Sequence, residues 1–264
     1  MNPVEITRGD SPVVLGLPHT GTHVPPDIMA RLNARGQVLA DTDWHIHRLY
    51  NGLLPGATTV RATFHRYVID ANRPPDGESL YPGQNTTGLV PLTDFDGHDI
   101  WNDAPDTDEV EARRAAFHAP YHAALQAELE RVRAIHGVAL LYDCHSIRSH
   151  IPFLFDGTLP DFNIGTAGGT TCAPSLQNAT LEICAEAKGY THILNGRFKG
   201  GWTTRHYGHP AEGFHAIQME LAQSTHLETE APPFDYSDRK AARLRPVLGK
   251  ILETLSDKVL ELRP

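Results

Sequence analysis

Residue types that bind metals and transfer protons lie directly after several short apolar segments of this chain. An apolar run at 13–17 leads into His19, and a second run at 138–142 leads into Asp143 and His145. Histidines and carboxylates are the usual ligands of a catalytic zinc ion, which takes about three protein ligands and keeps one position for water. The spacing is therefore typical of a hydrolytic metal centre assembled from separate segments.

The residues alone leave one ligand of this centre open. Asp43 precedes a stretch with helical spacing of apolar residues, where a carboxylate can also serve as a helix cap. His23 follows His19 by four positions and would share its face in a helix. The chain has no HExxH motif that would decide between them. A divalent metal, with Zn²⁺ favoured, fits this mixture of nitrogen and oxygen ligands.

Glu220 is the candidate general base. It lies inside the apolar segment at 215–222, where a carboxylate must be paired, have a raised pKa or serve a site. A buried salt bridge is one interpretation, and a base that takes a proton from metal-bound water is the other. Cys144 would point to the opposite strand face from His145, which argues against a Cys–His nucleophile. Ser146 lacks the GxSxG pattern of serine hydrolases.

Arginines in or beside loops predict an anionic substrate, because the planar guanidinium binds carboxylates through two hydrogen bonds. The chain as a whole carries a net charge of −9, which argues against nonspecific binding to nucleic acid or to an anionic membrane surface. The candidate substrate-binding arginines are Arg66, Arg73, Arg148, Arg197 and Arg205.

The elements that must position these residues alternate between strands and helices. Apolar and β-branched runs predict strands at 13–17, 57–64, 138–142 and 215–222. Helical spacing predicts helices at 38–54, 108–137, 174–189 and 237–262, with Pro120 expected to break or kink the second one. This alternation indicates an α/β fold with a mixed, mostly parallel sheet flanked by helices in three layers. We expect one catalytic metallohydrolase domain over residues 1–264, with its site at the carboxyl ends of the strands.

Cysteine usage and hydropathy bear on the compartment. Three cysteines without paired spacing (Cys144, Cys172 and Cys184) favour a reducing environment. The N-terminal residues do not resemble a signal peptide, and no apolar run approaches the roughly 18 residues of a membrane span. We therefore expect a cytoplasmic protein whose partner is a small molecule rather than nucleic acid or membrane. Its oligomeric state is not predicted.

Eight stretches of the chain together resemble the N-formylglutamate amidohydrolase (N-formylglutamate deformylase) family. They run in order from residue 18 to residue 223 and are PHTGTHVP, DTDWHIHRLY, HRYVIDANRPP, LYPGQNTTGLVP, DCHSIRSHIPFLFDG, LPDFNIGT, NGRFKGGWTTRHYG and HAIQMELAQ. That family is distantly similar to zinc carboxypeptidases and aspartoacylases. The resemblance therefore implies a zinc-carboxypeptidase-like fold.

The resemblance also implies a ligand set. The relatives carry their second metal ligand as a glutamate three residues after the first histidine, where this chain has Thr22. The family pattern favours Asp43 in its place, which gives His19, Asp43 and His145 as the expected metal ligands. His23 is the alternative to Asp43.

The reaction implied by the resemblance is the hydrolysis of N-formyl-L-glutamate to formate and L-glutamate in histidine degradation. Glu220 would act as general base on a metal-activated water, and Arg73 would offset negative charge at the reacting oxygen. Asn72 would hydrogen-bond the α-carboxylate. Two or more of the five arginines would hold the two carboxylates of the substrate.

Two other functions are compatible with the residues. The chain could hydrolyse another N-acyl amino acid or a peptide C-terminus with the same chemistry. It could also be a non-enzymatic protein that binds a metal or an amino acid. Metal storage predicts clustered histidines and cysteines, whereas the 16 histidines here are dispersed. A decayed enzyme would have lost a ligand or Glu220, and none of these is missing.

Overall fold

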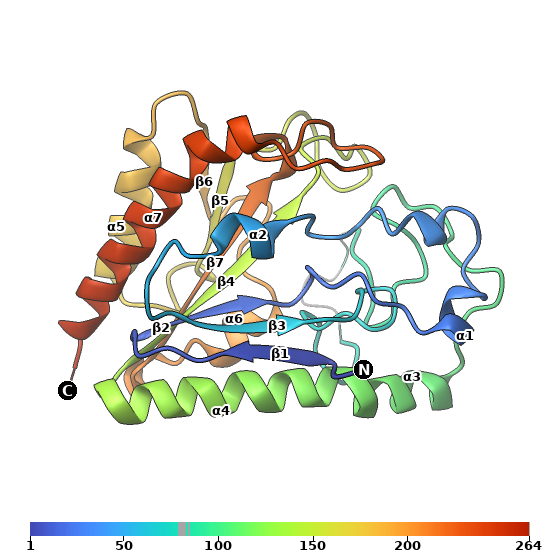
Figure 1. Cartoon of the computed structure of the whole chain (residues 1–264), viewed down its shortest axis with the longest axis horizontal. Helices are drawn as coiled ribbons and strands as arrows, with labels where there is room; N and C mark the ends of the chain where they lie inside the picture. The colour runs from blue at the N-terminus through green and yellow to red at the C-terminus, as the bar shows by residue number, and fades with distance from the viewer. Residues whose placement is uncertain (79–82, 84, 264) are drawn as a thin grey trace.

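The computed structural model describes residues 1–78, 83 and 85–263 (Figure 1). Residues 80–82 and 84, which belong to the LYPGQNTTGLVP stretch, lie outside the described residues. Within the described part of the chain, no helix combines the length and the apolar character that crossing a membrane requires.

A seven-stranded mixed sheet forms the centre of the molecule (Figure 1). β3, β2, β4 and β7 are neighbours and run parallel, whereas β1 and β5 are antiparallel to β3 and β7. The predicted mixed, mostly parallel sheet is therefore confirmed. In spatial order the strands are β1 (Val4–Thr7), β3 (Thr58–Ala62), β2 (Val13–Leu17), β4 (Ala139–Ile147), β7 (Phe214–Ala222), β5 (Phe162–Gly165) and β6 (His192–Leu194).

Helices cover both faces of the sheet and complete the three layers that we expected. α3 (Thr107–Arg113) and α4 (Ala119–His136) lie along one face, and α5 (Pro174–Glu186) and α7 (Asp238–Leu260) lie along the other (Figure 1). α7 turns a leucine-rich stripe with helical spacing toward the sheet, which is how an amphipathic helix buries its apolar face. The short helices α2 (Ile46–Tyr50) and α6 (Trp202–Tyr207) pack near the carboxyl ends of the strands.

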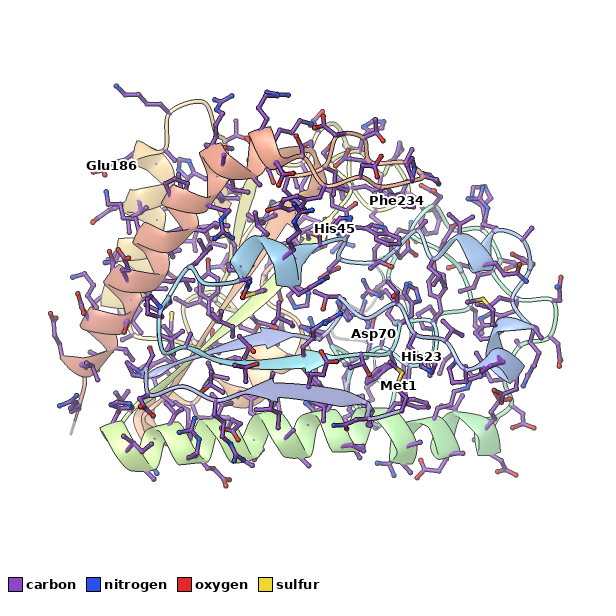
Figure 2. The ribbon with its side chains drawn as sticks, in the orientation of Figure 1. Met1, His23, His45, Asp70, Glu186 and Phe234 are labelled. Carbon is purple, nitrogen blue, oxygen red and sulfur yellow. The ribbon has the colours of Figure 1, made fainter. Side chains whose placement is uncertain are left out.

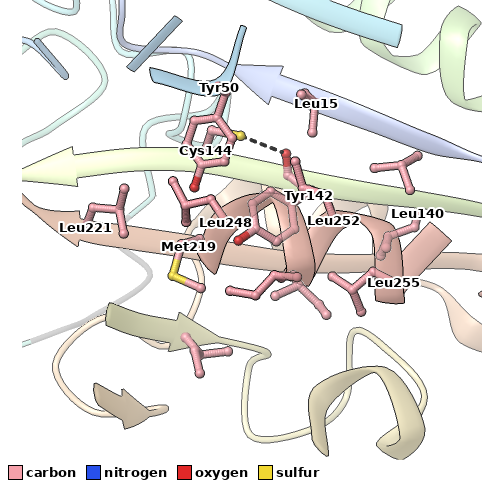
Figure 3. Close-up of a cluster of buried hydrophobic side chains, with 14 of the residues drawn as sticks. Leu15, Tyr50, Leu140, Tyr142, Cys144, Met219, Leu221, Leu248, Leu252 and Leu255 are labelled. Atoms are coloured by element: carbon pink, nitrogen blue, oxygen red, sulfur yellow. Dashed lines mark hydrogen bonds between the residues drawn. The ribbon is translucent and has the colours of Figure 1, made fainter. Parts of the chain in front are cut away.

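The side chains of β4 alternate between the two faces of the sheet. Leu140, Tyr142 and Cys144 join the hydrophobic core beneath α7 (Figure 3). Burial raises the pKa of the Cys144 thiol well above its usual value, which disfavours the reactive thiolate. Asp143 and His145 consequently point to the opposite face, toward α4 and α6.

Two predicted boundaries were wrong for reasons visible in the structure. β4 continues to Ile147, so Asp143 and His145 lie inside the strand and not after its end. Their polar side chains made the strand look finished in the sequence. The predicted helix at 38–54 is reduced to a short 3₁₀ turn and α2, because Leu39 and His45 both have positive φ and interrupt the helical path.

Pro120 does not break the long helix. The chain passes from α3 through a π-helical turn (Arg114–His118) directly into α4. Pro120 is the second residue of α4, directly after the π-helical turn. The other predicted elements are present with small shifts at their ends, and β1, β5, β6, α6 and the short α1 (Pro26–Met29) were not predicted.

Candidate metal centre and active site

Three buried side chains from distant parts of the sequence converge at the carboxyl ends of the parallel strands. His19 follows β2, Asp43 precedes α2, and His145 lies in β4. One potential ligand atom from each of the three lies within 4.8 Å of the others. The Asp43 Oδ2 atom is 3.1 Å from His145 Nδ1 and 3.8 Å from His19 Nδ1. This is a donor set that suits one divalent metal ion. His23 is not a member of this cluster.

The second ring nitrogen of each histidine contacts a buried carboxylate. His19 Nε2 lies 2.7 Å from Asp70 Oδ1, and His145 Nε2 lies 3.1 Å from Asp143 Oδ1. Metal-binding histidines commonly donate their other N–H to a carboxylate, which fixes the ring and leaves the opposite nitrogen free to coordinate. His19 makes this hydrogen bond with Asp70, and His145 lies within ion-pair distance of Asp143. In both rings that opposite nitrogen is the Nδ1 that faces Asp43.

The electrostatics of the cluster favour a positive charge at its centre. Burial acts to lower the pKa of His145, but the carboxylates of Asp143 and Asp43 outweigh it and raise the pKa well above its usual value. Burial and the charge of Arg66 lower the pKa of His19, so this imidazole stays neutral. His19 is therefore available as a neutral ligand, and the carboxylates of Asp43 and Asp143 favour a positive charge beside them. Both properties fit a bound cation.

Glu220 reaches the same place through the strand register. β4 and β7 pair so that His145 is opposite Glu220 and Asp143 is opposite Gln218, which puts all four side chains on one face. Gln218 Nε2 donates to Glu220 Oε2 at 3.1 Å. Burial, opposed by His145 and assisted by Asp43, raises the pKa of Glu220 to about 7. A carboxylate with this pKa can both accept and release a proton near neutral pH.

The turn after β3 supplies two further groups that we expected at the site. Arg66 is buried and donates to Asp70 Oδ2 at 2.6 Å, while its Nε has no hydrogen-bond partner among the described residues. Asn72 lies with Nδ2 3.2 Å from His145 Nε2, and its Oδ1 accepts a bond from Thr203 N. Burial disfavours ionisation of Asp70, yet Arg66 and His19 hold the pKa of its carboxyl well below the usual range. Asp70 therefore ties the metal cluster to Arg66.

A pocket opens above the cluster, and residues of the cluster form part of its lining. The charged and polar part of its lining could hold an anion, and the apolar part comes from Ile147 at the end of β4 and from side chains of three loops. The lining residues are His19, Asp43, Arg66, Asn72, Arg73, Asn85, Thr86, Thr87, Phe95, His145, Ser146, Ile147, Leu154, Arg197, Phe198, Gly201, Gln218 and Glu220.

The five candidate arginines divide between the pocket and its surroundings. Arg66, Arg73 and Arg197 line the pocket. Arg148 is not among the lining residues and lies 3.1 Å from the carboxylate of Asp96. Arg205, in α6, is also outside the lining, and its Nε donates to the Gly200 carbonyl.

Arg73 and Arg197 also bind the walls of the pocket. Arg73 Nε donates to the Thr87 carbonyl at 2.8 Å. Arg197 donates from Nε to the Leu154 carbonyl and from Nη2 to the Asn85 carbonyl, at 2.9 and 3.0 Å. These two guanidinium groups therefore hold the pocket walls in place and also contribute positive charge to the pocket.

The segment that carries Asp43 is held by residues near the C-terminal end of the chain, which the sequence did not reveal. Gln223 Nε2 donates to the Thr42 carbonyl, and His226 Nε2 contacts the Trp44 carbonyl at 3.1 Å. His45 Nε2 contacts the Phe234 carbonyl at 2.9 Å, and Figure 2 shows His45 and Phe234 on adjoining segments. Asp43 thus projects from a backbone fixed on both sides.

The model of the N-formylglutamate amidohydrolase family matches residues 11–227. The chain is 47% identical over 251 residues to N-formylglutamate deformylase of Pseudomonas aeruginosa, covering 94% of each protein. It is also 47% identical over 251 residues to N-formylglutamate deformylase of Pseudomonas putida, covering 94% of this chain and 93% of that protein.

Solved structures agree with this match. The crystal structure of N-formylglutamate amidohydrolase from Ralstonia eutropha JMP134 is similar with a TM-score of 0.83 and 27% identity, covering 98% of both chains. A gene product of Agrobacterium tumefaciens has the same fold, with a TM-score of 0.74 and 19% identity, and the match covers 98% of this chain and 96% of that one. Since the family model and both curated relatives extend over most of its length, the chain belongs to the N-formylglutamate amidohydrolase family.

Proposed function

We propose that this chain is an enzyme that hydrolyses N-formyl-L-glutamate to formate and L-glutamate. The observation that carries the proposal is the position of Glu220, beside the buried cluster of His19, Asp43 and His145 at the base of the pocket. The activity named for the curated relatives supports it. We further propose that the whole chain, residues 1–264, works as one catalytic domain and that its reaction belongs to cytoplasmic histidine degradation.

The proposed cofactor is a divalent metal, most simply Zn²⁺, held by His19 Nδ1, an Asp43 carboxylate oxygen and His145 Nδ1. This mixture of two imidazoles and one carboxylate fits zinc, and each imidazole has a carboxylate on its other nitrogen. When bound, the metal polarises the formyl oxygen and lowers the pKa of a water molecule.

Glu220 is the proposed general base. Its carboxylate accepts a proton from the attacking water, and the same oxygen can pass this proton to the amide nitrogen as the C–N bond breaks. The pKa of about 7 supports both steps, because the group is neither too weak a base nor too weak an acid at neutral pH. Gln218, which donates to Glu220 Oε2, orients the carboxylate toward the pocket.

The substrate carries two carboxylates, and the pocket offers several donors for them. We propose that Asn72 and Arg73 bind or orient the substrate near the reacting carbon, with Arg73 also offsetting charge on the carbonyl oxygen. Arg66 and Arg197 are the other lining arginines, and both are proposed to bind substrate carboxylates. Arg148 and Arg205 lie outside the lining. Their contacts with the substrate stay a prediction, and the pocket walls would have to rearrange for either residue to make them.

The test combines metal analysis with substrate comparison. Purified protein is treated with a chelator, dialysed and assayed on N-formyl-L-glutamate before and after Zn²⁺ is returned. Activity should vanish with the metal and return with it. N-formyl-L-leucine, N-acetyl-L-glutamate and a dipeptide ending in glutamate serve as comparison substrates. A kcat/KM on any of these equal to or above that on N-formyl-L-glutamate would reject the proposed substrate. Full activity in metal-free protein would reject the proposed cofactor.

A further inference from the structure

Two histidines outside the pocket lining contact the segment that bears Asn72 and Arg73. His118 ends the π-helical turn, and His122 lies one turn later in α4. His122 Nε2 lies 2.7 Å from the Ala71 carbonyl, and His118 Nε2 lies 3.0 Å from the Arg73 carbonyl. The two bonds therefore fall on either side of Asn72. Both imidazoles are buried, which makes the bonds costly to leave unmade.

The chemistry of the partners fixes which nitrogen of each ring carries the proton. A carbonyl oxygen only accepts, so Nε2 is the donor in both rings. His122 Nδ1 is then an acceptor, and the Tyr207 hydroxyl lies 3.0 Å from it and donates to the His122 carbonyl at 3.2 Å. Burial lowers the pKa of both His118 and His122, so each ring is neutral and has a single N–H to give. Each histidine thus donates its single N–H to one backbone carbonyl.

The segment at 70–73 depends on such bonds because it is not part of the sheet or of a helix. Its backbone-to-backbone bonds run from Arg73 N to the Asp70 carbonyl and from Asp70 N to the Leu89 carbonyl. Asn72 N also donates to Asp70 Oδ1 at 2.8 Å, and the Asn72 carbonyl accepts from Arg73 Nη1 at 3.1 Å. The carbonyls of Ala71 and Arg73, on either side of Asn72, are held by the two histidines. A displacement of this segment would move two proposed substrate-binding groups together.

The Trp202 side chain contacts both histidines. Trp202 packs its indole against both imidazoles, with ring centroids 5.7 Å from His118 and 4.6 Å from His122. The next residue in α6, Thr203, donates its N–H to Asn72 Oδ1 at 2.9 Å. The imidazoles hold the backbone around Asn72, and α6 holds its side chain.

We propose that His118 and His122 are positioning residues, which set Asn72 and Arg73 in the pocket by donating to the carbonyls of Arg73 and Ala71. The proposal rests on the proposed function, because Asn72 and Arg73 matter only if they act on the substrate. It adds residues that do not themselves reach the pocket.

The test is a set of matched variants assayed on N-formyl-L-glutamate. His122→Phe keeps the ring and removes the donor, whereas His122→Gln keeps an N–H close to the position of Nε2. His136→Phe is the control, because His136 lies in the same helix and its Nε2 contacts the Asp10 carbonyl at 2.7 Å, far from the pocket. We expect His122→Phe to lower kcat/KM about 10- to 100-fold, because it misplaces the groups that orient the substrate. His122→Gln should recover most of that loss, and His136→Phe should change kcat/KM less than threefold.

A double-mutant cycle separates positioning from general damage. If His122 acts through Asn72, the combined loss in Asn72→Ala with His122→Phe is more than threefold smaller than the product of the single losses. A combined loss within threefold of that product overturns the proposal. The proposal is also overturned if the kcat/KM of His122→Gln is not higher than that of His122→Phe. Bound metal per chain should be unchanged in all variants.

Two further outcomes keep the inference distinct from the proposed function. If His122→Phe does not fold, His118→Phe in a cycle with Arg73→Ala decides by the same threefold criterion. If the wild-type protein does not hydrolyse N-formyl-L-glutamate, the proposed function fails and this inference fails with it. An active wild type with an unaffected His122→Phe variant rejects only the positioning role.

Discussion

Replacing Glu220 with glutamine should make the metal-free protein more stable and the enzyme almost inactive. Glu220 is buried, and its pKa is about 7 rather than its usual 4.5. The native state thus holds a proton on this carboxyl more tightly than the unfolded chain does. At about 1.4 kcal/mol for each tenfold change in acid dissociation, an ionised Glu220 costs the fold about 3 kcal/mol.

The sign of the pH dependence follows from linkage. Between pH 4.5 and 7 the native state binds more protons at Glu220 than the unfolded state, so this residue makes stability fall as pH rises through that window. Below pH 4.5 both states are protonated and the penalty is absent. Above pH 7 the penalty is fully present. Glutamine has no such penalty, and its carbonyl can still accept the bond from Gln218.

The assay is urea unfolding of chelator-treated protein at pH 5 and pH 8. The free energy of unfolding of Glu220→Gln, relative to wild type, should increase by about 2–3 kcal/mol between these two values. Glu253→Gln removes an exposed carboxylate from α7 and controls for the change in net charge. With metal returned, kcat of Glu220→Gln should fall about 10²- to 10⁴-fold. Equal pH dependence in wild type and Glu220→Gln would refute the raised pKa, and near-normal kcat would refute the role as base.

Three other variants test the remaining parts of the site and the core. His145→Ala should lose bound metal in elemental analysis, because it removes one of three proposed ligands; a full metal complement would exclude His145 from the ligand set. Asp70→Asn should weaken metal binding about 10- to 100-fold in a chelator competition, since it removes the charged partner of His19 Nε2, and unchanged affinity would contradict that role. Leu252→Ala should lower the free energy of unfolding by about 2–5 kcal/mol, because Leu252 is fully buried beneath the sheet, while kcat per folded molecule stays within twofold. A fall in kcat as large as that in Glu220→Gln would show that α7 acts on the site.

The sequence predicted the central strands and their chemistry because both leave local signals. Apolar runs mark β2, β4 and β7, and a polar side chain at or within such a run is conspicuous, as His19 and Glu220 are. The period of two in a strand then assigned Cys144 to the core and His145 to the site. These inferences needed no knowledge of distant contacts.

The rest depends on contacts between residues far apart in the sequence. Nothing near Asp43 shows that Gln223 and His226 hold its segment in place. Arg148 resembles Arg66 in the sequence, yet Arg148 pairs with Asp96 while Arg66 pairs with Asp70 at the pocket. Tertiary pairing of this kind decides which arginine faces the substrate, and no local pattern encodes it.

The register of β7 also constrains how this chain can change during evolution. Gln218 and Glu220 face the pocket, while Met219 and Leu221 face the core beneath α7. A deletion of one residue early in the strand would exchange these faces and bury the base among leucines. A deletion of two residues would restore the face but move the base by about 7 Å along the strand. Insertions and deletions are therefore expected in the loops that flank β7 and not in the strand. Substitutions within the strand keep the register, so residues on the core face can change without moving those on the pocket face.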